Sequence, residues 1–302
     1  MGLVDILKGF VTGILILILM AALSVYIISN SLQSTLLQQS FYEQQLQETG
    51  LYIKLQGLMI DNIVSQFPES ELSKYGITKT DVKNAMSKAI TVDWVKNETN
   101  KNIKQMLWYL NDQTKGVNLS ISLRPKVEEG GAILISEKIG VDKDTALTLL
   151  KSTVSLDSIP DPITLESVAP GTTNALKGLK ENVMMFKSFS GQLLIGIIII
   201  LVLIFLLTLS LDKFARTIGI PFIVTGIILF VASFMLPGMV KDAVKGTGMT
   251  ESQNVITMTN VMDFLSPIFG SIMTQAIILI AAGVILVAFS FVYPMIIKKE
   301  KK

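Results

Sequence analysis

Carboxylates are the side chains in this sequence that could most readily do chemistry, because a facing pair of them can hydrolyse glycosides. The spacing of those between the apolar runs shows only ordinary surface charge; they include Glu69, Glu71, Glu128, Glu129, Asp142, Asp144, Asp157 and Asp161. The stretch VDKDTALTL resembles the beginning of a calcium loop but lacks the glycine and the remaining ligands of that motif. We therefore expect no catalytic residue and no metal site.

Two residue types that support much of enzyme chemistry are missing altogether. The 302-residue chain contains no cysteine and no histidine, which excludes disulfides, thiolate nucleophiles, Cys/His zinc sites and histidine-based acid–base catalysis. It also has no glycine-rich phosphate loop and no G-x-S-x-G motif. We expect a protein that is not an enzyme and binds no cofactor, and its net charge of +2 is too small to indicate nucleic-acid binding.

Long apolar runs dominate the sequence. Half of the residues are hydrophobic and only 17% are charged, against about 25% in soluble domains. Crossing a bilayer core as a helix takes roughly 20 apolar residues. Four runs without Asp, Glu, Lys or Arg meet this requirement: residues 10–31, 191–211, 218–237 and 271–297. The sequence predicts an all-α polytopic membrane protein with four transmembrane helices.

Basic residues orient these spans by the positive-inside rule. The short loop predicted at residues 212–217 contains Lys213 and Arg216, and the N-terminal segment contains Lys8. The C-terminal segment is more basic still, with Lys298, Lys299, Lys301 and Lys302. Because four spans place these three segments on one side, we expect a multi-pass plasma-membrane protein with both termini in the cytoplasm.

This topology divides the chain into parts with different surroundings. They are residues 1–31 with the first span, an extracytoplasmic domain at 32–190, the second and third spans at 191–237, a second outer segment at 238–270, and the fourth span with its basic tail at 271–302. The first span could instead be a signal peptide. Its apolar run is longer than the roughly 15 residues of a signal-peptide core, which favours an uncleaved anchor.

The extracytoplasmic domain is expected to be mainly α-helical with little β structure. Gly50, Pro68 and Gly76 separate successive helical patterns, and Thr78 or Thr80 is a candidate N-cap. The sequence EEGG at residues 128–131 predicts a break, before a capped helix and an extended linker. That linker is SIPDPITLESVAPG.

One stretch of the outer domain alternates as a strand does. VNLSISL places Val117, Leu119, Ile121 and Leu123 on one face and polar residues on the other. No clear second strand follows. Its pairing partner is therefore either an irregular segment of the same chain or another subunit, and the second possibility would indicate self-association.

Aromatic residues are the candidates for an interaction site. Trp94 and Trp108 lie fourteen residues apart on a predicted helix, so they share one face within about 40°, and Tyr109 adjoins them. The alternative, which we favour, is that the tryptophans fill the domain's core. Two sequons, at Asn97 and Asn118, are possible glycosylation sites on the outer side.

Small residues rather than charges characterise the spans. Gly9, Gly13, Gly219, Gly226 and Gly283 are candidate positions of close helix packing. Gradient-driven transporters usually place ionisable residues within the membrane, and these spans contain none.

The outer domain contains a recognisable pattern: Trp94, then WYLNDQ from Trp108 to Gln113, then LSISL from Leu119 to Leu123. In this it resembles a family of uncharacterised prokaryotic four-span membrane proteins with a large extracytoplasmic domain. The resemblance implies no activity. Claudin-type proteins share only the topology, because their outer cysteine pair is absent.

These features together predict a cell-envelope protein of structural or interaction type. Its extracytoplasmic domain would bind a protein partner or itself as a homo-oligomer, and the lipid bilayer surrounds its spans. Two alternatives stay open: an oligomeric pore or transport subunit, and a ligand-binding sensor without a cytoplasmic output domain of its own.

Overall fold

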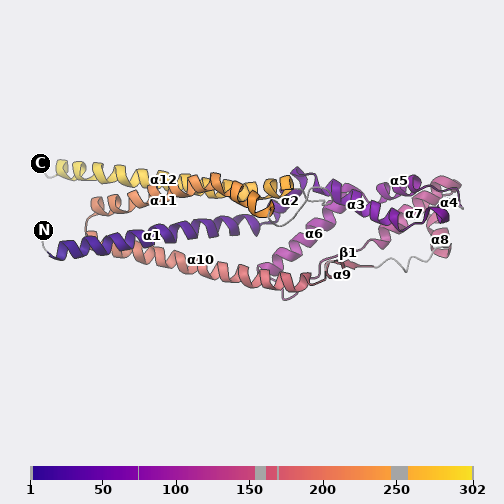
Figure 1. Cartoon of the computed structure of the whole chain (residues 1–302), viewed down its shortest axis with the longest axis horizontal. Coiled ribbons are helices and arrows are strands. Elements are labelled where there is room, and N and C mark those ends of the chain that lie inside the picture. The colour runs from indigo at the N-terminus through magenta and orange to yellow at the C-terminus, as the bar shows by residue number, and fades with distance from the viewer. Residues whose placement is uncertain (1–2, 74, 154–160, 169, 246–257, 301–302) are drawn as a thin grey trace. The chain divides into compact units, whose positions relative to one another are not determined.

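The computed structural model describes residues 3–73, 75–153, 161–168, 170–245 and 258–300 (Figure 1). Helices make up almost all of the described chain, so the predicted all-α class is confirmed. The chain divides into two compact units. Unit 1 is Met1–Leu37 with Val183–Lys302, and unit 2 is Gln38–Asn182.

Unit 1 is built from long apolar helices (Figure 1). Each contains a segment of between 30 and 37 residues that is long and apolar enough to cross a membrane, and each such helix covers all or nearly all of one predicted run. The prediction of four candidate spans is therefore confirmed. The helices are α1 (Leu3–Leu36), α10 (Thr172–Thr208, which begins in unit 2), α11 (Leu211–Lys245) and α12 (Met258–Glu300).

The turn between α10 and α11 lies earlier than the sequence predicts. Residues 212–217, expected to form the loop, are instead the first turns of α11, and the turn is Leu209–Ser210. Leu209 has a left-handed backbone with φ of 50°. The Ser210 hydroxyl donates to the Asp212 carboxylate, and the Phe214 N–H donates to the Ser210 carbonyl at 2.8 Å. These contacts begin α11 directly after the turn, so the charged residues Asp212, Lys213 and Arg216 lie inside this helix.

Glycines allow α11 and α12 to approach closely. A Cβ atom added to Gly283 would lie 2.6 Å from the Gly219 carbonyl oxygen, and one added to Gly219 would lie 2.9 Å from the Gly283 carbonyl oxygen. A Cβ atom on Gly226 would lie 2.9 Å from the Ala276 carbonyl oxygen. Such distances leave room only for hydrogen, so backbone packs directly on backbone.

Helix α1 packs against the other helices through two apolar clusters. The first joins Leu19 and Leu23 of α1 to α10 and to Ile218 of α11. The second joins Ile27 of α1 to Leu229 of α11 and to α12. A polar contact adds to them, because the Gln33 side-chain nitrogen donates to the Ser190 hydroxyl of α10 at 3.0 Å.

We expect Gly283→Leu to lower the free energy of unfolding of unit 1 by about 2 kcal/mol, because overpacking forces the two helices apart. The full-length protein in detergent is heated to a series of temperatures, and size-exclusion chromatography measures how much of it remains monodisperse at each one. Gly13→Leu is the matched control, since a Cβ atom there meets nothing within 4 Å. Equal losses for the two variants would contradict close packing at Gly283.

Unit 2 consists of shorter helices and a two-stranded ribbon. Sequence signals mark several of their boundaries: Gly50 adopts φ of 65° before α3, and the Thr91 hydroxyl accepts from the Trp94 N–H at the start of α6. The elements are α2 (Gln39–Glu48), α3 (Leu51–Ser65), α4 (Glu69–Ser73), α5 (Lys79–Ala89), α6 (Val92–Leu110), β1 (Ser120–Ile121), α7 (Arg124–Ile139), α8 (Lys143–Thr153), β2 (Ile163–Thr164) and α9 (Leu165–Val168).

The core of unit 2 lies between α3, α5, α6 and α7. Among its most buried members are Met86, Ile90 and Val95, with side chains of α3 and α7 packed against them. The Gln56 amide of α3 donates to the Ile90 carbonyl at 2.7 Å, which satisfies a backbone group at the end of α5. Apolar burial and a paired polar group thus hold these helices together.

The prediction of a helix break at EEGG is wrong, because residues 128–131 lie inside α7. The two glycines are contact points rather than interruptions. A Cβ atom on Gly130 would lie 2.6 Å from the Met86 side chain, and one on Gly131 would lie 2.7 Å from Leu150. Close packing of α5 and α8 against α7 outweighs the low helix propensity of glycine.

The predicted strand at residues 117–123 contains a shorter strand, β1. It pairs antiparallel with β2, in the register Ser120 to Thr164 and Ile121 to Ile163. Its partner therefore belongs to the same chain, inside the segment predicted to be an extended linker.

A capping box begins α5 and makes the stability of unit 2 depend on pH. The Thr78 backbone N–H and hydroxyl, followed by the Lys138 ammonium at 3.1 Å, lower the pKa of the Asp81 carboxyl from 3.8 to about 2. Because this pKa is depressed on folding, the contribution is present above pH 3.8 and is lost as the pH falls towards 2.

We expect Asp81→Asn to unfold more easily than the native protein at pH 7, and to lose less stability between pH 4 and pH 2. Tryptophan fluorescence during denaturation follows unit 2 alone, because the chain's two tryptophans both lie in α6. Asp93→Asn is the control, since Asp93 also stands in a first helical turn. If the stability of the two variants depends on pH in the same way, the capping box is not the source of the pH dependence of unit 2.

Candidate binding cavity

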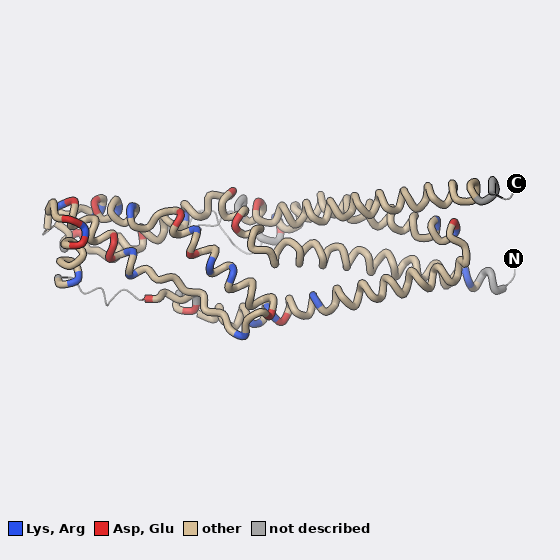
Figure 2. The backbone as a smooth tube through the Cα atoms, turned by 180° about the vertical axis from the view of Figure 1, so that it is seen from behind, with Lys and Arg blue, Asp and Glu red and all other residues tan. Residues whose placement is uncertain are grey.

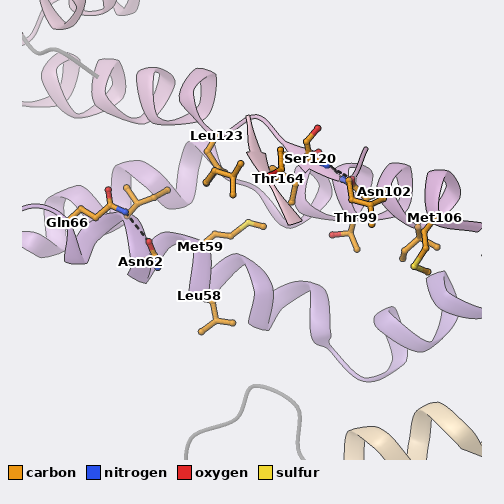
Figure 3. A pocket seen from close by; sticks show the side chains of 15 residues that line it. Leu58, Met59, Asn62, Gln66, Thr99, Asn102, Met106, Ser120, Leu123 and Thr164 are labelled. Carbon is orange, nitrogen blue, oxygen red and sulfur yellow. Dashed lines mark hydrogen bonds between the residues drawn. The ribbon is translucent and has the colours of Figure 1, made fainter. Parts of the chain in front are cut away.

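Unit 2 contains a cavity of about 520 Å³ between α3, α6 and the ribbon (Figure 3). Its volume falls within the range of roughly 300–1,000 Å³ found for small-molecule sites. Nine of the lining side chains are apolar and six are polar but uncharged. They are Leu58, Met59, Asn62, Ile63, Gln66, Thr99, Asn102, Ile103, Met106, Leu119, Ser120, Ile121, Leu123, Ile163 and Thr164.

The two helical walls come from amphipathic patterns that are only partly used for the core. On α6, Val95, Leu107 and Leu110 are buried, whereas Ile103 and Met106 are half-buried and face the cavity. On α3, Ile63 is buried while Met59 is half-buried. Apolar side chains that would normally complete a core therefore border an open space.

A pair of hydrogen bonds fixes the third wall. The Asn102 side-chain nitrogen donates to the Ser120 carbonyl at 3.1 Å, and the Ser120 N–H donates to the Asn102 side-chain oxygen at 2.9 Å (Figure 3). The amide thus pairs with the free edge of β1 as a third strand would. With Ser120 held on α6, Leu119, Ile121 and Leu123 line the cavity.

The polar groups of the cavity are neutral, and several of them are already hydrogen-bonded. Asn102 and Ser120 bond to each other. Away from this pair, on α3, the Gln66 side-chain nitrogen donates to the Asn62 side-chain oxygen at 3.1 Å (Figure 3). No lining residue is an acid or a base, so the hydroxyls of Thr99, Ser120 and Thr164 have no ionisable partner among the residues that line the cavity.

The predicted aromatic site is not assembled at this cavity. Trp94 packs against the core of unit 2, with the Lys126 ammonium 6.0 Å from its ring. Trp108 is 42% exposed, with the Lys104 ammonium 4.8 Å from its ring. Tyr109 is buried beneath Lys180, and none of the three aromatic residues lines the cavity.

Several of the acidic candidates form helix caps or ion pairs. Lys126 at 2.7 Å and Lys143 at 2.9 Å hold the pKa of the Glu129 carboxyl below its ordinary value. Asp142 accepts from the Thr145 N–H at 2.9 Å and caps α8. Asp157 lies outside the described residues. Within the described chain no three acidic residues gather in a group that could hold a metal ion.

The remaining candidates fall in different environments. Asn97 and Asn118, the two sequon asparagines, are both exposed in unit 2. Gly9 and Gly13 are exposed within unit 1 and meet no neighbour within 4 Å, unlike the three glycines that join α11 and α12. In the spans, the hydroxyl of Ser24 donates to the Met20 carbonyl at 2.9 Å, as expected of a side chain bonded within its own helix.

Comparison with protein-family models, curated proteins and solved structures finds no match to this chain. The functional argument therefore depends on the cavity. Sequence reasoning missed it, although two signals were present: the alternation of Leu119, Ile121 and Leu123, and the stripe that includes Ile103 and Met106. Neither pattern reveals whether its apolar face meets another side chain or an open space.

We expect Asn102→Ala to lower the free energy of unfolding of unit 2 by about 1–3 kcal/mol, because it leaves the Ser120 N–H and carbonyl without these partners. Tryptophan fluorescence during denaturation of the full-length protein measures the change. Lys101→Ala, an exposed position on the same helix, is the control. An Asn102→Ala variant as stable as Lys101→Ala would mean that these hydrogen bonds do not hold the wall.

Proposed function

We propose that this chain is a cell-envelope membrane protein of the interaction type, which binds a partner molecule in the cavity of unit 2. The observation that carries the proposal is an uncharged cavity of about 520 Å³, lined mainly by apolar side chains, in unit 2. Unit 2 would face the outside of the plasma membrane, with both termini in the cytoplasm.

The contrast between core and cavity supports a binding role. Met86, Ile90 and Val95 are buried to within 2% exposure, which is ordinary for a packed interior. Ile103, Met106 and Ile121 lie in the same unit and remain half-exposed around the cavity. Leaving apolar area in water costs about 25 cal/mol per Å², so a ligand that covers these side chains gains free energy.

The distribution of charge supports the proposed orientation. The start of α1, the turn Leu209–Ser210 and the end of α12 lie at one end of unit 1 (Figure 2). Lys8 lies near the start of α1, and Lys213 and Arg216 lie in the first turns of α11, directly after this turn. Clustered basic residues favour the cytoplasmic side.

A ligand-binding sensor is the second candidate, and a specific observation favours it. Ile163 and Thr164 of β2 line the cavity, and the chain continues from them through α9 into α10, a helix that runs unbroken to Thr208. Occupancy of the cavity would thus act on the segment that leads into a span. Any output would have to pass through a partner protein.

Photo-crosslinking in the producing cell tests the proposed function. We expect a photoreactive amino acid at Met106, in the cavity wall, to give several-fold more adduct than the same residue at Lys101. Lys101 lies on the same helix and is exposed outside the cavity. The mass of the adduct shows whether the partner is a protein, a second copy of the chain or a lipid. No adduct at Met106, or equal adducts at both positions, would contradict binding in the cavity.

A further inference from the structure

We infer that the cavity takes the hydrocarbon chain of a membrane lipid. This inference rests on the proposed function, that the cavity is a binding site, and it names the chemical class of the ligand. Charge, hydrogen bonding and shape each contribute to it.

The walls exclude a charged or strongly polar ligand. None of the 15 lining residues is Asp, Glu, Lys or Arg, so an ion entering the cavity would lose its hydration without gaining a counter-charge. A sugar needs many hydrogen bonds in place of those it makes with water. Here the Asn102 amide already bonds to the backbone of Ser120, and nine of the 15 lining residues are apolar.

The ribbon does not favour an extended peptide as the ligand. Peptides commonly bind by adding a strand to the free edge of a sheet. At β1 that edge is occupied, because the Asn102 side chain bonds to both the N–H and the carbonyl of Ser120. A peptide in the cavity would bring backbone polar groups to walls made mainly of Leu, Ile and Met.

The dimensions fit a flexible chain. The cavity follows α6 from Thr99 to Met106 and α3 from Leu58 to Gln66, which at the helical rise corresponds to about 10–12 Å. If a methylene group occupies about the volume of a water molecule, roughly 30 Å³, the space holds on the order of fifteen of them. Met59 and Met106 are unbranched and flexible, so they can adapt to such a chain.

One end of the cavity suits a polar head group. Asn62 and Gln66 are exposed there, and their mutual hydrogen bond still leaves amide groups that can contact a ligand (Figure 3). A chain anchored in the bilayer by four apolar helices also encounters lipid at a higher concentration than other apolar molecules. The source that we propose is therefore a bilayer lipid, with its head group towards these amides.

The test uses the full-length protein in phosphatidylcholine vesicles that contain a phosphatidylcholine with a diazirine at the end of one chain. After irradiation and proteolysis, mass spectrometry maps the adducts. We expect adducts on the cavity residues of α3 and α6, in addition to those on the spans. Label on the spans, which contact lipid directly, shows in every sample that the chemistry worked.

Cavity-filling variants show whether the label enters the cavity. Ile103→Phe should reduce the adducts on the cavity residues several-fold and leave those on the spans unchanged. Ile53→Phe adds the same ring at a 64% exposed position of α3 outside the cavity. This control should change neither the adducts on the cavity residues nor those on the spans. Tryptophan emission from α6 checks folding, and Leu119→Phe replaces Ile103→Phe if that variant does not fold.

Three outcomes would overturn the lipid inference. They are adducts confined to the spans, cavity adducts that neither filling variant reduces, and a loss of cavity adducts in Ile53→Phe equal to that in the filling variants. If the lipid probe labels only the spans while Met106 crosslinks to a protein or to a second copy of the chain, the lipid inference fails and the proposed function stands. If the cavity is labelled by neither method, both fail.

Discussion

The paired hydrogen bonds between the Asn102 side chain and the Ser120 backbone hold the wall of the cavity that β1 and its flanks form. A ribbon of two strands with two residues each is too small to be stable alone in water, so β1 and β2 need a support outside themselves. The amide supplies it by satisfying the edge of β1. The apolar residues of β1 and its flanks are therefore kept opposite α3 and α6, and a space remains where a core would otherwise close.

Unit 1 is held together by a different interaction. In a bilayer, helices gain little from burying apolar side chains, because the surrounding lipid is just as apolar. Close packing must therefore supply the free energy that holds the helices together. Gly219, Gly226 and Gly283 allow such packing by bringing backbone against backbone. Unit 2 therefore depends on apolar burial and polar pairing, whereas the closest packing in unit 1 is that of α11 against α12.

Local signals in the sequence were sufficient to predict much of this fold. The apolar runs correspond to the long helices of unit 1, and Thr78 begins α5 as one of its two candidate caps. Long periodic runs and caps are recognisable because they depend on neighbouring residues. What could not be predicted depends on contacts that are distant in sequence. Gly130 and Gly131 look like a helix break until Met86 and Leu150 are seen against them.

The cavity is the clearest case of this limit. Its residues appear in the sequence as an ordinary helical stripe and an ordinary alternating strand, both typical of a core. Whether Ile103 faces a side chain or a space depends on where the partner of β1 lies, and that partner is in a segment predicted to be a linker. Trp94 and Trp108 show the converse: a shared helical face did not give them the same surroundings.

The pairing of Ser120 with Thr164 also has a kinetic consequence. The helices of unit 2 can form from nearby residues, but the ribbon requires two distant segments to meet, with α7 and α8 between them. The entropy of closing so long a loop is regained only when the last contacts are made. The cavity should therefore be completed late in folding and be the first part of unit 2 to open, by a local fluctuation that leaves the helical core intact.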